Sequence, residues 1–548
     1  MRNNLDKQVI LLFFVSLIIL GVNLGIFPVN IMEARNFITA REMVQDDNWI
    51  LTTLNGEPRY EKPPLPTWLT AVLGLVFGFD SVAVLRVAVV LTTFLLVFYI
   101  YKLSLKLGLS GRNSFHNGLI LLTSFYIYFA GRDNQWDMYC HSFMIVSIYY
   151  LWNILRLNKE PVKNAVIGGL FLSFSILSKG PVSIYALFFP FLLAYGWVYK
   201  FELKKNKKYL KALLIYLSVG IAVGVSWSVY VRWADPVPLA EVAKKETSRW
   251  INDYNSKSFF YYWNFFIQSG IWSISALLAL IYPYMKSRVS DLKAYKFTLI
   301  WTLASLILLS IIPEKKVRYI LPVLIPMALT TGFYVEYMIS GLKTKTDKII
   351  AVFHFGLLGF IGISYSPVLF FVFKEKISGQ MLWAVLSSVS MFIMGVVIFY
   401  YLKRNNFKKV LYSLVALQCV IIIFAFPLAK SFLHNPRYRS VKELHRFTGD
   451  KMTLYDYKYM SPEIVWDYGE KVPYIDDAGI EKQLVKLNKD YIGILCFEKD
   501  TDKLIKNWQK KYNVRKVSYL DLNTVSPDNK DYKDRLTRNF LIVFKKNY

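Results

Sequence analysis

The stretch 32–69 combines carboxylates and cations between two strongly apolar segments, and it reads MEARNFITAREMVQDDNWILTTLNGEPRYEKPPLPTWL. Ionisable groups beside a bilayer need water or a partner, so such a mixture at a membrane face indicates a functional site rather than an ordinary solvated loop. Clustered cations suit a phosphate headgroup, because they stabilise the negative charge that develops when it leaves. A nearby carboxylate suits deprotonation of an incoming hydroxyl. The chemistry predicted is group transfer from a phosphate-linked lipid.

More ionisable residues stand at the ends of other apolar runs. Acids occur in RDNQWDMY, and cations occur in LSKGP and KKVRYILPVLIP. The candidates from these segments are Asp133, Asp137, Lys179, Lys315, Lys316 and Arg318, with Tyr319 beside the last. They join the site only if the chain brings these ends to one side of a membrane.

The composition predicts a polytopic α-helical membrane protein. The chain has 548 residues, of which 55% are hydrophobic and 17% aromatic. About thirteen apolar runs approach the twenty residues that a bilayer core requires. The first run, residues 9–27, has no small-residue cleavage site after it, so we expect a retained helix and a cytoplasmic N-terminus.

Positively charged loops give the expected orientation. Loops near 102–112, 156–163, 200–208, 286–296, 343–348 and 403–409 carry Lys and Arg and are expected inside. This alternation holds if the run 64–79 forms a short interfacial or re-entrant helix, started by Pro63, Pro64 and Pro66. The segments 29–81, 132–137, 178–180, 232–263, 313–317 and 429–548 then share the outer side, and every candidate residue lies in one of them or, like Arg318 and Tyr319, directly after it.

The net charge of +28 does not require a nucleic-acid partner, because most Lys and Arg lie in short loops where they set topology and meet anionic headgroups. Three cysteines, Cys140, Cys419 and Cys496, lie far apart and in no CxxC spacing. Neither a zinc cluster nor a disulfide framework is therefore expected. The histidines His116, His141 and His354 adjoin apolar runs, where polar contacts within the bundle are commoner than metal ligation.

The composition changes after Pro427. The tail contains strand-like segments, among them KMTLYDY, YIGILCF and NFLIVFKK, with helical stretches such as TDKLIKNWQKK between them. We expect a transmembrane domain at 1–428, whose outer loop 29–81 carries juxtamembrane helices, and a small soluble α/β domain at 429–548.

The segments EARNFITAREM, NWILTTLNGEPRYEKPPLPTWL, LSKGP and KKVRYILPVLIP together resemble those of the GT-C integral-membrane glycosyltransferases. Within that superfamily the similarity is to the aminoarabinose (lipid A) transferase and protein O-mannosyltransferase group. The YEKPP block after an acidic helix is specific, whereas the SKG and RY elements alone are weak. The resemblance implies transfer of a sugar from a polyprenyl-phosphate donor to lipid A, a surface glycan or a protein.

The resemblance also implies residue roles. Lys62, with Arg59, Lys179, Arg318 and Tyr319, is expected to hold the donor phosphate. The catalytic carboxylates are expected to be Glu33, Glu61 and Asp137.

Two departures from the family pattern affect the site. Met32 stands where the family usually has Asp, which leaves Glu33 as the nearest carboxylate for the base. Ser256 stands where aminoarabinose transferases have a metal-binding His, and Glu61 alone is a poor site for a cation that needs several ligands. We expect no cofactor, with a divalent metal as the disfavoured alternative.

Other interpretations stay open. Lys62 alone could be an interfacial anchor, Asp137 a cap of the helix near Met138, and Arg35 and Glu42 exposed charges on a helix face. The alternative function is a transporter or flippase of a lipid-linked sugar, which should place charges or broken helices near the midplane. A scaffold role for the tail leaves the charged first loop unexplained. The expected location is a bacterial inner membrane, with site and tail periplasmic.

Overall fold

The computed structural model describes residues 2–157, 159–201, 207–251, 256–433, 435–448, 452–459, 461–486 and 490–546. Its contacts divide the chain into two compact units. Unit 1 comprises Met1–Leu24, Tyr60–Leu69 and Ala83–Leu428, and unit 2 comprises Gly25–Arg59, Thr70–Val82 and Ala429–Tyr548. The segment 25–82 therefore contributes to both units.

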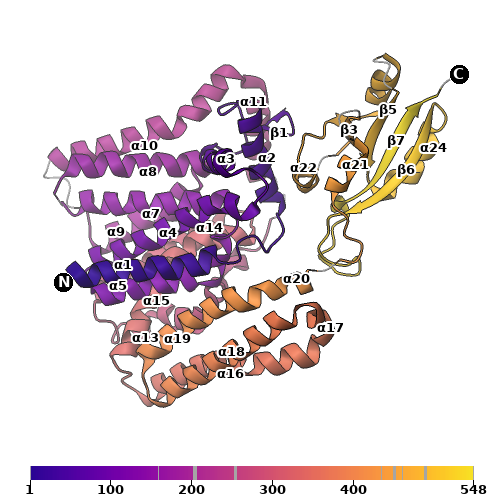
Figure 1. Ribbon diagram of the computed structural model, residues 1–548. Helices are drawn as coiled ribbons and strands as arrows, with labels where there is room; N and C mark the ends of the chain where they lie inside the picture. Colours follow the sequence, from indigo (N-terminus) through magenta and orange to yellow (C-terminus); the bar gives the residue numbers. More distant parts are fainter. Residues whose placement is uncertain are drawn as a thin grey trace. The chain divides into compact units, whose positions relative to one another are not determined.

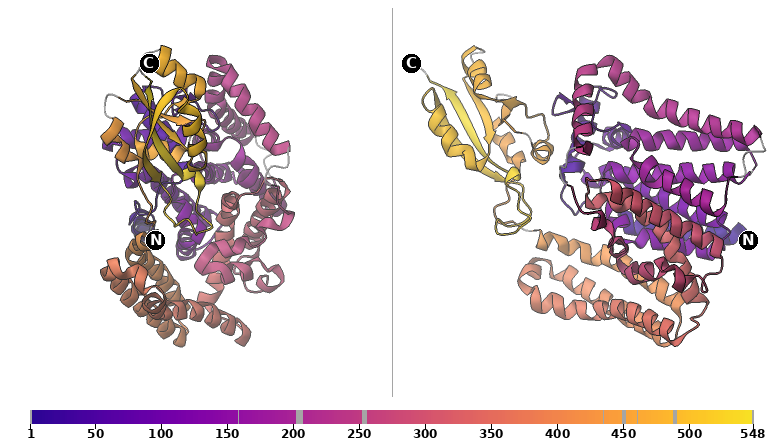
Figure 2. Two further views of the ribbon diagram at one scale, coloured as in Figure 1. Left: turned by 90° about the vertical axis from the view of Figure 1, so that its right-hand side faces the viewer. Right: turned by 180° about the vertical axis from the view of Figure 1, so that it is seen from behind.

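Unit 1 is a bundle of long helices, which run side by side in Figure 1 and, seen from behind, in Figure 2. Its α-helices are α1 (Arg2–Ser16), α4 (Val82–Lys106), α5 (Gly111–Thr123), α6 (Phe125–Ala130), α7 (Trp136–Leu155), α8 (Pro161–Lys179), α9 (Phe189–Val198), α10 (Lys207–Ala234), α11 (Pro236–Ile251), α12 (Ser273–Leu280), α13 (Tyr282–Met285), α14 (Leu292–Ile311), α15 (Leu321–Ser340), α16 (Lys345–Val372), α17 (Lys374–Ile377), α18 (Met381–Lys403) and α19 (Phe407–Val420).

Glycines allow the close packing of α8 with α10 in unit 1. A Cβ on Gly220 would lie 2.5 Å from Leu172, and one on Gly169 would lie 2.7 Å from the carbonyl oxygen of Tyr216. Small residues at a helix interface let backbones approach, which is how helices associate in lipid. The helix α8 also packs against α7, so α7, α8 and α10 form one continuous layer.

The prediction of a multi-pass helical protein is confirmed, whereas the count of about thirteen spans is not. Within the described residues, nine helical segments are long and apolar enough to cross a membrane. The remaining runs include helices that are shorter or interrupted, such as Lys7–Gly21 and Ile184–Val198. Ser124 interrupts the run 115–131, because its extended backbone (φ −66°, ψ 127°) separates α5 from α6.

The run 64–79 forms a short helix, α3 (Leu65–Phe77), which continues from unit 1 into unit 2. Its 13 residues rise about 20 Å at 1.5 Å each, less than the thickness of a hydrocarbon core. The prediction of a short helix here is confirmed.

Unit 2 contains a five-stranded sheet in the order β4-β3-β5-β7-β6. Strands β3 (Leu454–Tyr457), β4 (Tyr474–Ile475) and β5 (Tyr491–Cys496) are parallel, whereas β7 (Thr537–Lys545) runs antiparallel to β5 and β6 (Tyr512–Asp521). The other elements of unit 2 are α2 (Ile31–Gln45), β1 (Thr53–Leu54), β2 (Glu57–Pro58), α20 (Ala429–Phe432), α21 (His445–Thr448), α22 (Pro462–Tyr468), α23 (Asp477–Glu481) and α24 (Thr501–Trp508). The predicted strands KMTLYDY, YIGILCF and NFLIVFKK overlap β3, β5 and β7.

Alternating side chains of the sheet build two cores. On one face, Ile494 of β5 and Leu541 of β7 pack with Trp508 of α24. On the other, Leu495 and its neighbours pack with α22 and with Ile38 of α2. A period of two along a strand sends successive side chains to opposite faces, so both faces are covered. Helix α2, more than 400 residues earlier in the chain, is thus part of the core of unit 2.

Candidate active site

Five segments of unit 1 converge on a cavity of about 560 Å³. They are the turn before α3, the first turn of α7, the end of α8, the 3-10 turn Phe259–Tyr262, and the chain around the 3-10 turn Val317–Ile320. The polar residues that line the cavity are Glu61, Lys62, Asp137, His141, Lys179, Tyr185, Tyr262, Glu314 and Tyr319. Apolar side chains, such as Leu309 and Ile312, complete the wall.

The structure thus brings together five predicted site residues: Glu61, Lys62, Asp137, Lys179 and Tyr319. The residues come from positions where apolar runs begin or end. That is the arrangement expected if these ends share one side of a membrane.

Asp137 and Lys179 form a buried ion pair at the cavity wall, with the Lys179 ammonium donating to Asp137 Oδ1. Asp137 is 6% exposed and Lys179 8% exposed. Helix α7 begins at Trp136 with Gln135 as its N-cap, so Asp137 lies inside the first turn and is not the cap. Gly180 follows Lys179 directly, and its φ of 67° lets the chain turn away where α8 ends.

Lys179 also lies over an aromatic ring, with its Nζ 5.3 Å from the ring centroid of Tyr319. The Arg318 guanidinium lies 5.6 Å from the same centroid and is within electrostatic range of Asp137. Lys316 lies 5.9 Å from this centroid, so three cations are near Tyr319, and two of them, Lys179 and Arg318, interact with the Asp137 carboxylate. Such a group can bind an anionic ligand while keeping a proton acceptor beside it.

The other two cations of the segment 313–319, Lys315 and Lys316, form bonds within the protein that stabilise the loop. Lys316 pairs with Glu314 at 2.5 Å, and Lys315 Nζ donates to the carbonyls of Ile312 at 2.6 Å and Lys257 at 3.1 Å. Burial lowers the pKa of Lys315. The Tyr262 hydroxyl donates to the carbonyl of Lys316 and accepts from its N–H, both at 3.0 Å. Lys315 thus connects its own loop, which follows α14, to the loop that contains Lys257.

Glu61 and Lys62 are half-buried at the cavity, and the residue before them is fixed. The Tyr60 side chain is 5% exposed, and its hydroxyl donates to Asp235 Oδ2 at 2.7 Å. Its ring meets Trp227 edge to face at 6.2 Å between centroids. The sequence does not single out Asp235, which stands between α10 and α11.

Glu33 and Arg59 belong to unit 2 and do not line this cavity. Glu33 is fully buried in the first turn of α2 and forms a capping box with Asn30, whose Nδ2 lies 3.2 Å from Glu33 Oε2. Arg59 Nη1 donates to Thr39 Oγ1 at 3.0 Å and holds its own segment against α2. Both contacts support the fold, and the catalytic and phosphate-binding roles of these residues stay predictions.

Glu42 is not the exposed helix-face charge that one interpretation allowed. It is 1% exposed and accepts hydrogen bonds from Thr53 Oγ1 at 2.6 Å, Asn55 N at 2.7 Å and Gly56 N at 3.2 Å. Three donors satisfy its carboxylate, which closes the β1–β2 hairpin onto α2. Its charge is structural.

The acids and the imidazole of the cavity do not gather as metal ligands. Among the described residues, no group of three His, Cys, Asp or Glu side chains is placed to hold a metal ion. Asp137 is bound to Lys179, Glu314 to Lys316, and His141 Nδ1 lies 3.0 Å from Ser183 Oγ. Ser256, at the usual His position, pairs by its backbone with Glu314.

Sequence reasoning missed two of the lining residues, Glu314 and Tyr185, and treated His141 only as a polar contact in the bundle. Glu314 directly precedes the KKVRY segment, and its charge at the end of an apolar run could have marked it as a site residue. Tyr185 follows the SKG turn by a few residues in an apolar run, where nothing in its type marks it.

The chain is similar to known proteins in sequence and in fold. The family model described as dolichyl-phosphate-mannose-protein mannosyltransferase matches residues 61–227, a stretch that contains Glu61, Lys62, Asp137 and Lys179. The fold is similar to that of ArnT from Cupriavidus metallidurans bound to undecaprenyl phosphate, with a TM-score of 0.69, 17% identity and 98% coverage of both chains. The predicted resemblance to the GT-C glycosyltransferases is confirmed.

Curated relatives point the same way. The chain is 24% identical over 383 residues to undecaprenyl phosphate-alpha-4-amino-4-deoxy-L-arabinose arabinosyl transferase 1 of Proteus mirabilis, covering 66% of this chain and 67% of the relative. It is 26% identical over 355 residues to the corresponding transferase of Serratia proteamaculans, covering 60% and 59%. The alignments thus span about two thirds or less of these GT-C relatives.

Proposed function

We propose that the chain is a membrane glycosyltransferase that moves a sugar from a polyprenyl-phosphate carrier to a hydroxyl or phosphate group of an acceptor. The acceptor class is lipid A, a surface glycan or a protein. The observation that carries the proposal is the convergence of Glu61, Lys62, Asp137 and Lys179 on one cavity with an apolar wall. Relatives that are named as transferases from undecaprenyl phosphate support this function over a flippase.

The proposed reaction uses these groups in two ways. A carboxylate, either Glu61 or Asp137 at the cavity or Glu33 in α2, takes the proton of the acceptor as its oxygen bonds to the anomeric carbon of the sugar. The bond from that carbon to the phosphate oxygen breaks, and the carrier leaves as a polyprenyl phosphate. Lys62 and Lys179, with Arg318 and Tyr319 beside them, stabilise the charge on the departing phosphate. Arg59 was also expected at the phosphate, but it lies in unit 2, and its part in this step stays a prediction.

The location proposed is a bacterial inner membrane, with the cavity and the residues 429–548 on the periplasmic side. The support is the charge bias of the loops expected inside. In a Cys419→Ser background, a cysteine placed at exposed Lys506 should react with a membrane-impermeant maleimide in intact spheroplasts, since the native Cys140 and Cys496 are buried whereas Cys419 is only partly buried. Labelling only after permeabilisation would reverse the orientation.

Lys62→Ala tests the function itself. Removing one preorganised group from a developing charge typically costs about 10²–10³ in rate. We therefore expect transfer from undecaprenyl phosphate-linked aminoarabinose to lipid A, the first donor and acceptor to be tried, to fall by that factor in purified protein. Lys163→Ala is the matched control, because Lys163 is exposed and pairs only with its helix neighbour Glu160.

Folding is followed by thermal unfolding in detergent. Transfer at the wild-type rate by a well-folded Lys62→Ala protein would leave Lys62 as an interfacial anchor and remove the main support for the proposed function. Loss of transfer in both variants would mean that the assay reports general damage.

A further inference from the structure

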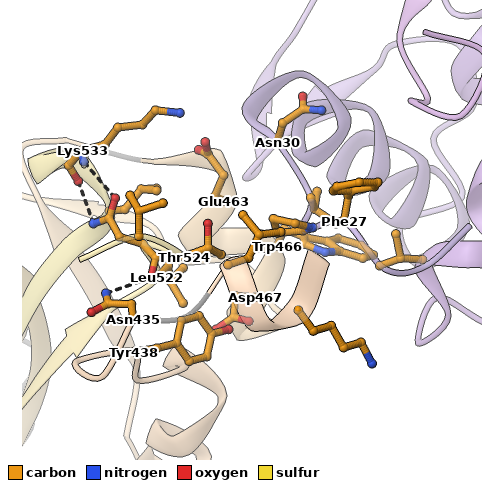
Figure 3. A pocket seen from close by; sticks show the side chains of 18 of the residues that line it. Phe27, Asn30, Asn435, Tyr438, Glu463, Trp466, Asp467, Leu522, Thr524 and Lys533 are labelled. Carbon is orange, nitrogen blue, oxygen red and sulfur yellow. Dashed lines mark hydrogen bonds between the residues drawn. The ribbon is translucent and has the colours of Figure 1, made fainter. Parts of the chain in front are cut away.

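A second cavity, of about 1090 Å³, lies within unit 2 and has no part in the reaction proposed above. We call it the unit 2 pocket. Its walls are the segment Gly25–Asn30, the chain at 430–433 and 435–442, the helix α22, and the segment 522–536. Figure 3 shows many of the side chains that line it.

Aromatic side chains come from three of these walls: Phe27, Tyr438 and Trp466. Trp466 packs against Phe37 at 5.1 Å between ring centroids, so it is anchored from the α2 side. Tyr438 is 47% exposed. Aromatic rings with one polar edge are enriched where a protein meets the headgroup layer of a membrane.

The lysines of the pocket form no ion pairs with the residues that the structure describes, whereas most of its carboxylates accept hydrogen bonds. Lys430, Lys442 and Lys533 are exposed, and their ammonium groups form no ion pair with any residue that the structure describes. Among the carboxylates, Glu463 is held by Arg535 at 2.5 and 2.6 Å, and Asp467 accepts from Ser440 Oγ and Val441 N, both at 2.7 Å. Of the lining residues that the structure describes, Asp531 alone adds a carboxylate that is not bound in this way. When Arg535 is counted with the lining residues, these groups are four cations and three carboxylates.

Two walls of the pocket consist of segments that come directly after an apolar helix in the sequence. Gly25 follows the first helical run, which ends at Gly21, by four residues, a reach of about 14 Å at most. Lys430 lies in the last apolar segment, Phe407–Phe432, three residues before Leu433. Chain that directly follows an apolar helix lies close to lipid headgroups when that helix is embedded in a bilayer.

We propose that the unit 2 pocket binds the phosphate headgroup of an anionic glycerophospholipid of the surrounding bilayer. The three lysines supply the charge, the aromatic rings supply the interfacial contacts, and the volume suits one headgroup. Occupancy ties the segment Gly25–Asn30, which directly precedes α2, to the segment 430–438, which connects the last apolar helix to the sheet. The proposal is independent of the glycosyl transfer proposed above.

The test uses the full-length chain in nanodiscs of phosphatidylcholine that contain increasing shares of phosphatidylglycerol. A photo-crosslinking phenylalanine analogue replaces exposed Tyr438, and mass spectrometry measures the lipid adduct. Each lysine near an anionic surface contributes roughly a five-fold gain in binding. The double variant Lys442→Gln/Lys533→Gln should therefore need about 25-fold more phosphatidylglycerol for half-maximal adduct. Lys503→Gln/Lys506→Gln, on exposed positions of α24 outside the pocket, is the matched control and should change nothing.

Several outcomes would overturn the proposal. Equal adduct yields in pure phosphatidylcholine would show that no anionic lipid is selected. An equal response of the two double variants would place the adduct elsewhere. Displacement of phosphatidylglycerol by millimolar inorganic phosphate would make this a site for a free anion, and displacement by a phosphorylated glycolipid at equal membrane share would assign the pocket to an acceptor.

Discussion

The hydroxyl of Tyr60 donates a 2.7 Å hydrogen bond to Asp235, which links the residue before Glu61 to the turn between α10 and α11. Burial, followed by the hydrogen bond to this carboxylate, raises the pKa of Tyr60, so the phenol stays protonated and remains a donor. Because Glu61 and Lys62 follow directly, this contact fixes the position of the chain from which both reach the cavity.

Tyr60→Phe should lower the kcat of transfer about ten-fold and leave KM for the donor nearly unchanged. The variant removes a hydrogen bond to a charged group, a contact worth about 1.5–3 kcal/mol, but keeps the ring against Trp227. Asp235→Asn retains an acceptor oxygen and should keep more activity than Asp235→Ala. Tyr230→Phe, on an exposed face of α10, is the control. Wild-type kinetics in both Tyr60→Phe and Asp235→Ala would contradict the positioning role.

The buried pair of Asp137 with Lys179 predicts different results for single and double variants. Asp137→Asn leaves the Lys179 ammonium buried without its partner, which should cost about 3–5 kcal/mol in the free energy of unfolding. The double variant Asp137→Asn/Lys179→Met removes both charges and should recover most of that stability. It should not recover transfer. Thermal unfolding and transfer rates are measured on the same preparations, and an active double variant would show that the pair serves packing alone.

Asp456 of β3 predicts a pH dependence of the stability of unit 2. It is 1% exposed, and although Arg538 Nε lies 3.3 Å from its Oδ1, burial raises its pKa from 3.8 to about 7. The folded protein therefore binds a proton more tightly than the unfolded chain does. The free energy of unfolding should fall as the pH rises between these two values, by at most about 1.4 kcal/mol per pH unit.

The measurement compares the melting temperature of the full-length wild type with that of Asp456→Asn across this pH range. Because asparagine does not ionise, the melting temperature of Asp456→Asn should fall less steeply with rising pH than that of the wild type. Asp502→Asn, an exposed acid of α24, is the control and should leave the slope unchanged. Parallel curves for the wild type and Asp456→Asn would show that Asp456 is ionised throughout.

Much of the cavity could be predicted because its residues lie at the boundaries of apolar runs. The alternation of positively charged loops is enough to put four of them on one side of a membrane, and unit 1 brings these four to one cavity: Glu61, Lys62, Asp137 and Lys179. The strands of the tail were also predictable, because their alternating side chains match the two cores on the faces of the sheet.

The remaining features depend on contacts between residues far apart in the chain. Nothing in the periodicity of α2 shows that Ile38 completes a core with residues after 440, or that Asp46 pairs with Lys471 at 2.7 Å. The charge of Glu42 likewise gave no sign that three donors from the hairpin would bury it. The count of about thirteen spans is not confirmed, and an apolar run does not reveal where a residue such as Ser124 interrupts its helix.

The identity of the base is tested most sharply at Glu33. Its carboxylate accepts hydrogen bonds from Asn30 in the capping box of α2, so a simple deletion would confuse helix stability with catalysis. Glutamine also serves in a capping box, and Glu33→Gln therefore keeps the cap while it removes the charge. If Glu33 is the base, this variant should bind undecaprenyl phosphate normally, melt at the wild-type temperature and transfer about 10²–10⁴-fold more slowly. Glu33→Ala should lose the cap as well and melt earlier. Normal transfer by Glu33→Gln, together with loss of transfer in Glu61→Gln, would move the base from α2 to the cavity of unit 1.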